Sequence, residues 1–196
     1  MCLKAASGPA LRWSRPRREI VVKPLRVGVV GTAYWAREVH ASGIQGSTAE
    51  LAGVWGRNEV ARQEVAAQHG VRAFRAFREL LDAVDIVTFA VPPAVQPELA
   101  IRAAEAGKHV ILEKPIALGA REAEAIAEAV SSHEVASLVF FTRRFVPEIT
   151  EAIAEARRAD WAEARVVAHN PAMATASPFA GSAWRQEPGS ALWSST

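Results

Sequence analysis

Short apolar runs alternate with stretches of helical periodicity between residues 25 and 141 of this 196-residue chain. Runs rich in Val, Ile and Leu are typical of parallel strands buried on both faces, whereas apolar positions spaced by three and four predict helices. The predicted strands are 25–31, 51–55, 85–91, 109–112 and 135–141, and the predicted helices are 33–44, 59–69, 77–83, 97–106 and 120–130. Strands that alternate with helices predict βαβ units, and therefore an α/β fold with a doubly wound parallel sheet of the Rossmann type.

The pattern changes after Phe141. Pro147 begins a helical stretch over 148–158, residues 164–168 are strand-like, and the remainder is rich in Pro, Ser and Gly without periodicity. We therefore predict three parts: a disordered basic extension over 1–22, a Rossmann-type domain over 23–145, and the incomplete start of a second domain over 146–196. For the extension, a basic binding tail is the alternative.

Charge is concentrated at the amino terminus. The net charge is +2, but residues 1–19 hold five basic side chains against Glu19, so the remainder is slightly acidic. This distribution predicts no nucleic-acid partner. The chain shows neither the apolar core of a signal peptide nor an apolar run of about 18 residues that would span a membrane. The lone cysteine, Cys2, excludes an internal disulfide and no histidines have metal-ligand spacing, so we expect a cytoplasmic protein without a metal site.

The end of the first predicted strand carries a turn suited to a phosphate. Residues 31–36 read Gly-Thr-Ala-Tyr-Trp-Ala, with small residues at the first, third and sixth positions. In the dinucleotide fingerprint these positions make the tight turn, admit the pyrophosphate and allow the next helix to pack on the strand. Ala33 and Ala36 replace the second and third glycines, so an ordinary strand–turn–helix is the alternative.

The end of the second predicted strand bears on which dinucleotide would bind. An NAD-preferring enzyme places Asp or Glu there to bind the ribose 2′-hydroxyl, but residues 55–58 read Trp-Gly-Arg-Asn. Arg57 offers a guanidinium, which binds phosphate as a fork of donors. This favours NADP, with NAD as the second choice. The alternative is that Arg57 is a solvated surface residue.

The strand predicted over 109–112 ends abruptly in Glu113-Lys114-Pro115, where Pro115 cannot continue a strand ladder. Ligands of open α/β sheets bind outside the carboxyl ends of the strands. A lysine at that edge can act as a general acid or base. Strand alternation directs Glu113 and Lys114 to opposite sides, so that one faces a ligand and the other the scaffold. A strand-end surface lysine is the alternative.

Together these motifs resemble those of the glucose–fructose oxidoreductase, inositol dehydrogenase and rhizopine-catabolism (Gfo/Idh/MocA) family, from about Leu25 to Leu192. The stretch RVGVVGTAYWA matches the family's opening, and AGKHVILEKPIA matches its most specific signature. The resemblance implies an NAD(P)-binding Rossmann domain followed by an α+β domain with an open antiparallel sheet. It also implies hydride transfer between the nicotinamide and a hydroxyl-bearing carbon of a small-molecule substrate: a sugar, a polyol or a related alcohol.

The resemblance assigns roles to single residues. Lys114 would be the catalytic, cofactor-contacting residue, and Pro92 would lie against the nicotinamide ribose. Arg144 falls in a segment that resembles the family's N-x-R-F-x-P, and Trp184-Arg185 in one that closes over the cofactor. The predicted cofactor-binding set is Gly31, Thr32, Ala33, Tyr34, Trp35, Arg57, Pro92, Glu113, Lys114, Pro115, Arg144, Trp184 and Arg185.

The chain also departs from the family pattern. Gln96 stands where the family often has histidine, and Thr142 where asparagine is usual. The chain reaches Thr196 where the family continues into D-x-G-x-H, which supplies an active-site aspartate and histidine. A non-catalytic dinucleotide-binding fragment is therefore the alternative function. The family forms homo-oligomers through the second domain's sheet, an association not expected of this truncated chain. His40 is expected to be a surface or internally satisfied histidine.

Overall fold

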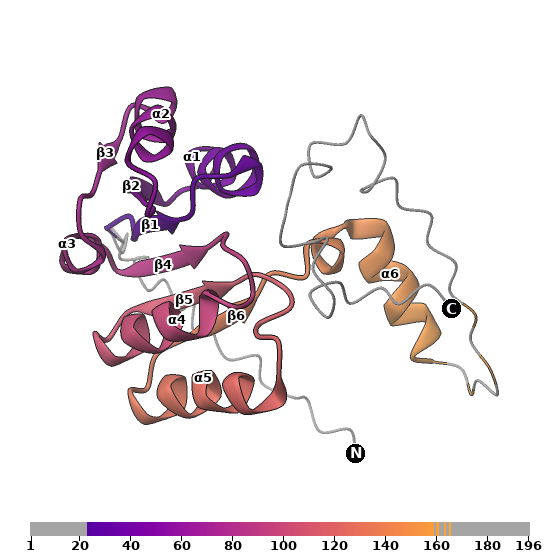
Figure 1. The fold of residues 1–196 in the computed structure, drawn as a ribbon. Coiled ribbons are helices and arrows are strands. Elements are labelled where there is room, and N and C mark those ends of the chain that lie inside the picture. The colour runs from indigo at the N-terminus through magenta and orange to yellow at the C-terminus, as the bar shows by residue number, and fades with distance from the viewer. Residues whose placement is uncertain (1–22, 159, 161–162, 164, 166–196) are drawn as a thin grey trace, which may run out of the picture.

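The computed structural model describes residues 23–158, 160, 163 and 165, and Figure 1 shows a parallel sheet with helices on both faces. The strands are β1 (Arg26–Val30), β2 (Glu50–Trp55), β3 (Arg72–Ala73), β4 (Ile86–Phe89), β5 (His109–Leu112) and β6 (Ser137–Val139). They lie in the order β3-β2-β1-β4-β5-β6, and all neighbours are parallel. The predicted Rossmann-type α/β fold is thereby confirmed.

The helices connect the strands and extend the chain beyond the sheet. They are the π-helix η1 (Trp35–Ala41), α1 (Ser42–Gln45), α2 (Glu59–His69), α3 (Phe77–Ala83), α4 (Gln96–Glu105), α5 (Ala120–Ser132), the 3₁₀ helix η2 (Thr142–Phe145) and α6 (Pro147–Ala156). The sheet is built outward from its centre, first through β1, β2 and β3 and then through β4, β5 and β6. The direction in which successive strands are added to the sheet reverses between β1 and β4. Doubly wound sheets bind ligands at such a switch point.

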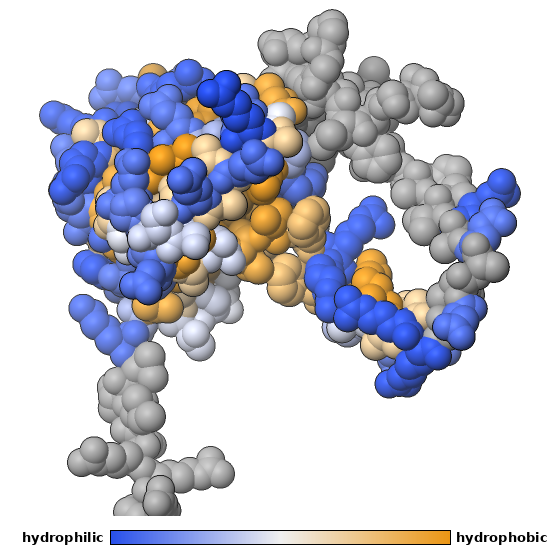
Figure 2. Space-filling view, turned by 90° about the horizontal axis from the view of Figure 1, so that it is seen from below, coloured by the Kyte–Doolittle hydropathy of each residue, from blue (hydrophilic) through white to orange (hydrophobic). Residues whose placement is uncertain are grey.

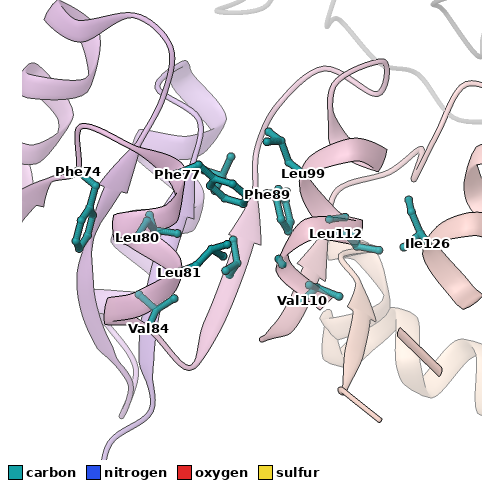
Figure 3. Close-up of a cluster of buried hydrophobic side chains, with 14 residues drawn as sticks. Phe74, Phe77, Leu80, Leu81, Val84, Phe89, Leu99, Val110, Leu112 and Ile126 are labelled. Carbon is teal, nitrogen blue, oxygen red and sulfur yellow. The ribbon is translucent and has the colours of Figure 1, made fainter. Parts of the chain in front are cut away.

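Two apolar clusters hold the layers together, one on each face of the sheet. On one face, α3, α4 and α5 pack on the strands around Leu80, Phe89 and Leu99 (Figure 3). On the other face, η1 and α2 pack on β1 and β2 around Val29 and Val65. Burying one such side chain contributes roughly 1.5–3 kcal/mol. The clusters therefore fix the strand ends from which the site is built.

Local signals explain several element boundaries. The Asn58 side chain accepts a hydrogen bond from the Ala61 N–H at 3.0 Å, which begins α2, and Gly70 ends it with a left-handed φ of 65°. The predicted helices 59–69 and 77–83 and the predicted strand 109–112 are confirmed at both ends.

Other boundaries differ from the prediction. The strand predicted over 135–141 is shorter, and β3 was not predicted because two residues carry no periodicity. The helix predicted over 33–44 begins as a π-helix. The predicted extension 1–22 and most of the strand-like run 164–168 lie outside the described residues, so the division into three parts stays a prediction.

An apolar surface begins on the last strand, β6, and continues into the segment that follows it. Leu138, Phe141, Phe145 and Val146 are each between 39% and 59% exposed. Figure 2 shows apolar surface between the sheet domain and the segment that carries α6. No residue of α6 is buried among the parts that the structure describes.

A charge pair joins the beginnings of β1 and β4. The Arg26 guanidinium donates to both Asp85 carboxylate oxygens, at 3.2 and 2.8 Å, and the Arg26 backbone N–H donates to Oδ2 at 2.9 Å. The hydrogen bonds from the Arg26 side chain, followed by that from its backbone, lower the pKa of Asp85 to about 2. The pair therefore stabilises the contact between the two central strands.

The Asp85→Asn variant should be less stable than the parent by about 1 kcal/mol at neutral pH, because the pair is one-third exposed and partly screened. The folded-state pKa is depressed, so the contribution is complete above the unfolded pKa near 4 and is lost as the pH falls towards about 2. Urea unfolding between pH 7 and pH 3 measures the difference. Asp82→Asn, which breaks the more exposed Arg78–Asp82 pair, is the control and should change little. A constant difference across this pH range would contradict the assignment.

Candidate functional site

The carboxyl ends of β1, β2 and β4 surround a cleft of about 500 Å³ at the switch point of the sheet. Its walls come from the three loops that follow these strands and from the start of α4. The lining residues are Gly31, Thr32, Ala33, Trp55, Gly56, Arg57, Asn58, Ala90, Val91, Pro92, Val95 and Leu99. The lining combines apolar side chains such as Val91 and Leu99 with the polar Arg57 and Asn58, which suits a ligand that combines rings with charged groups.

The turn after β1 is held between the neighbouring strands. The Gly31 N–H donates to the Trp55 carbonyl at 2.9 Å. The Gly31 φ of 129° is one that side chains rarely allow, and a Cβ there would lie 2.3 Å from the Ala90 carbonyl oxygen. Only glycine fits this position. Ala33 is exposed on the cleft wall, and Ala36 is fully buried under it, as a small residue at the sixth position of the fingerprint should be.

The loop after β2 presents a cation to the cleft. Arg57 is exposed and, among the described residues, forms no ion pair. Beneath it, the Arg62 side chain is only 7% exposed and donates through Nη1 to the Gly56 carbonyl at 3.0 Å. Sequence reasoning did not single out Arg62, since its position in α2 gives no sign of this tertiary contact.

Glu113 and Lys114 lie directly after β5 and differ in burial. Glu113 is 8% exposed, whereas Lys114 is solvent-exposed at the end of β5. The Glu113 carboxylate accepts hydrogen bonds from Trp35 Nε1 and, at 3.0 Å, from the Lys114 backbone N–H, and it lies 3.2 Å from His40 Nε2. Glu113 thus faces the scaffold and fixes the backbone of the lysine.

The π-helix η1 explains how two of these partners reach one carboxylate. In a π-helix the hydrogen bonds join residues five apart, and such turns recur at functional sites. Trp35 and His40 are five apart and both contact Glu113 Oε1. His40 is buried, and its Nδ1 lies 2.7 Å from Thr88 Oγ1. His40 is therefore satisfied internally, one of the two environments expected for it.

Gln96 holds the segment after β5 from the other side. It is fully buried; its Oε1 accepts the Glu113 N–H at 2.9 Å, and its Nε2 donates to the Glu113 and Ile116 carbonyls at 2.9 and 3.0 Å. The Lys114–Pro115 peptide in this segment is cis. The side chain that departs from the family's histidine therefore satisfies the backbone on both sides of Lys114.

The predicted cofactor-binding residues do not all meet at one place. Gly31, Thr32, Ala33, Arg57 and Pro92 line the cleft. The other predicted residues of the described chain do not line it: Tyr34 lies directly before η1 and Trp35 in it, Glu113, Lys114 and Pro115 follow β5, and Arg144 lies in η2, where its Nη1 donates a hydrogen bond to Thr150 Oγ1 at 3.2 Å. Trp184 and Arg185 lie outside the described residues.

The described residues contain no group of three or more side chains suited to hold a metal ion. None of the helices there is long and apolar enough to cross a bilayer.

Comparison with known proteins bears on this site. A family described as "Oxidoreductase family, NAD-binding Rossmann fold" (Gfo/Idh/MocA) matches residues 25–141. UDP-N-acetylglucosamine 3-dehydrogenase from Acidithiobacillus ferrooxidans is 32% identical over 125 residues, 64% of this chain and 39% of that protein. Its solved structure superposes with a TM-score of 0.64 and 30% identity, covering 68% of this chain and 44% of that one.

Two further relatives match similar shares of the chain. Inositol 2-dehydrogenase from Rhizobium meliloti is 32% identical over 63% of this chain and 38% of that protein. D-xylose 1-dehydrogenase (NADP(+)) 2 from Haloferax volcanii is 30% identical over 65% of this chain and 40% of that protein. The chain therefore spans about two fifths of the length of these relatives.

Proposed function

This chain belongs to the Gfo/Idh/MocA oxidoreductase family, and on that basis we propose that it is the nucleotide-binding part of an NADP-dependent dehydrogenase. The proposed reaction moves a hydride between the nicotinamide and a hydroxyl-bearing carbon of a sugar, a polyol or a related alcohol. The relatives named above act on a nucleotide sugar, an inositol and a pentose, all of which carry such carbons.

The observation that carries the proposal is the cleft at the switch point. Its turn after β1 admits only glycine at position 31, and the turn opens onto the loop that bears Arg57. A cation beside a glycine turn at the carboxyl edge of a parallel sheet fits a phosphorylated dinucleotide. When bound, the nicotinamide would accept or donate the hydride, and the protein would orient it.

Lys114 is proposed to move the proton of the substrate hydroxyl. It is exposed at the end of β5, the strand next to β4 and therefore one strand from the cleft. Its backbone is held by the Glu113 carboxylate and, through Glu113, by Gln96. A lysine whose main chain is fixed while its ammonium group is free can reach a substrate oxygen without reorganising the strand.

The choice of NADP rests on the loop after β2. Gly56 presents no carboxylate to a ribose hydroxyl, and the exposed Arg57 is available to a 2′-phosphate. An arginine fork binds phosphate through charge-assisted hydrogen bonds, which contribute more than neutral ones.

The Arg57→Ala variant should therefore weaken NADPH binding by about 1–3 kcal/mol, or roughly 5- to 150-fold, and leave NADH binding almost unchanged. Titration of both reduced cofactors by their fluorescence measures the effect. Arg121→Ala removes the same charge from the exposed start of α5, outside the cleft, and should alter neither affinity. Equal losses for NADPH and NADH, or an NADH preference in the parent chain, would refute the assignment of Arg57.

A further inference from the structure

Four segments that are far apart in the sequence meet at the ring of His40. This residue belongs to η1, and its side chain is 2% exposed. Its Nδ1 lies 2.7 Å from Thr88 Oγ1 in β4, and its Nε2 lies 3.2 Å from Glu113 Oε1, directly after β5. The ring of Phe140, directly after β6, packs edge-on against it with the centroids 5.1 Å apart. Three elements therefore hold the His40 ring, although the proposed reaction does not use it.

The partners of the Glu113 carboxylate determine which atoms carry hydrogens. Trp35 Nε1 and the Lys114 backbone nitrogen can only donate, and both donate to Glu113. Since a carboxylate only accepts, Nε2 of His40 carries a hydrogen and is the third donor. The Thr88 hydroxyl can donate or accept, so it satisfies Nδ1 in either protonation state of the ring. His40 can therefore hold the carboxylate without losing its own second hydrogen bond.

These hydrogen bonds form a chain that cannot deliver a proton to a substrate. The chain runs from Thr88 through His40 and Glu113 and ends at the backbone N–H of Lys114, which is not a working acid. It can, however, fix the position of that N–H, because a buried carboxylate whose partners are all in place resists reorientation. The ammonium group of the lysine extends from the main chain that is held in this way.

We infer that His40 is a positioning residue for Lys114. It holds one oxygen of the Glu113 carboxylate so that the other oxygen, Oε2, stays 3.0 Å from the Lys114 nitrogen. This inference rests on the proposed function, in which Lys114 moves the proton of the substrate hydroxyl. It adds to that function a buried side chain that touches neither the lysine's ammonium group nor the lining of the cleft.

Three backbone N–H groups of one segment separate this role from a general loss of stability. The Lys114 N–H is held by the Glu113 carboxylate. The Glu113 N–H is held instead by Gln96 Oε1 at 2.9 Å. The Val110 N–H, in β5, donates to the Ala136 carbonyl at 3.0 Å. Global unfolding exposes all three groups, whereas a local loss of the carboxylate's orientation exposes only the first.

Hydrogen exchange of these amides in the full 196-residue chain, followed by NMR, tests the inference. In His40→Leu the Lys114 amide should exchange at least about tenfold faster relative to the Val110 amide, the effect of losing one hydrogen bond to a charged group. His40→Gln keeps a donor for Glu113 and should restore most of the protection. Thr88→Val removes only the hydroxyl that orients the ring, so it should act in the same sense more weakly, and it serves if His40→Leu does not fold.

Gln96→Leu is the matched control, because it removes the partner of the neighbouring N–H group. It should expose the Glu113 amide more than the Lys114 amide, the reverse of His40→Leu. Amides that respond alike to His40→Leu and Gln96→Leu would show that the segment is held as one unit, and the inference would be overturned. A His40→Gln variant no better protected than His40→Leu would overturn it too.

The consequence for the reaction is measured in a fusion that joins the continuation of a full-length relative after Leu192. There His40→Leu should lower kcat by about tenfold or more, since misplacing a reacting group costs factors of this order. The KM for NADPH should change little, because His40 does not line the cleft. An unchanged kcat would overturn the link to catalysis. An inactive parent fusion would refute the proposed function, whereas the exchange rates would still decide whether His40 positions the main chain of Lys114.

Discussion

Replacing Lys114 by alanine is expected to lower kcat by about 10²- to 10⁴-fold, the range that one proton-transferring residue contributes. The assay uses a fusion in which the continuation of a full-length relative is joined after Leu192, so that the substrate is held for hydride transfer. Lys114 is exposed beyond the end of β5, so its removal should leave the fold intact. Cofactor affinity should fall far less than kcat, because the cleft residues remain.

The control for this experiment is the lysine at the opposite end of the same strand. Lys108 precedes β5 and donates through Nζ to the Val84 carbonyl at 3.0 Å. Lys108→Ala should reduce stability without reducing kcat. Added methylamine should restore part of the activity of the Lys114→Ala fusion and should not change the activity of the parent fusion. A fusion whose kcat survives the loss of Lys114 would show that another group moves the proton.

The second large effect is expected at the turn after β1. Gly31→Ala places a Cβ against the Ala90 carbonyl at a φ of 129°, a conformation that costs about 1–3 kcal/mol for a residue with a side chain. β1 and β4 must then separate at their carboxyl ends, which displaces two walls of the cleft. NADPH affinity should fall at least about tenfold, the equivalent of 1.4 kcal/mol, and the unfolding midpoint should fall with it.

Gly43→Ala provides the control, because a Cβ on Gly43 in α1 meets nothing within 4 Å. It should leave both affinity and stability close to those of the parent. Ala33→Gly tests the other side of the same turn and should bind NADPH as well as the parent or better, since it removes a methyl group from the cleft wall. Unchanged binding by Gly31→Ala would remove the fingerprint from the proposal.

The parts of the fold that the sequence predicted are those governed by local signals. The Asn58 cap, the Gly70 terminus and the apolar run before Glu113 each determine a boundary through contacts within a few residues. β3 was not predicted because its two residues are ordered by pairing with β2 rather than by any pattern of their own. The π-helix η1 was not distinguished from an α-helix because the spacing of its apolar residues is similar in the two.

The site was predictable only where one residue type carries the chemistry. Gly31 and Arg57, which line the cleft, and Lys114, whose role stays a proposal, follow strand ends and could be chosen on that ground. The groups that hold Lys114 could not, because His40 is 73 residues from Glu113 and Gln96 is 17 residues from it. Gln96 was noted only as a departure from a family pattern, and nothing in the sequence indicates its hydrogen bonds.

The two apolar clusters become available at different times as the chain is made. The cluster beneath η1 and α2 draws its buried residues from Val29 to Ala66, whereas the cluster on the other face needs residues as late as Ile126. β1 can therefore pair with β2 early. Its other edge stays unpaired until β4 has been made, because the contact between Arg26 and Asp85 joins residues 59 apart in the sequence. Closing so long a loop slows folding. On a ribosome, one face of the sheet would be covered while the Lys114 edge was still being synthesised.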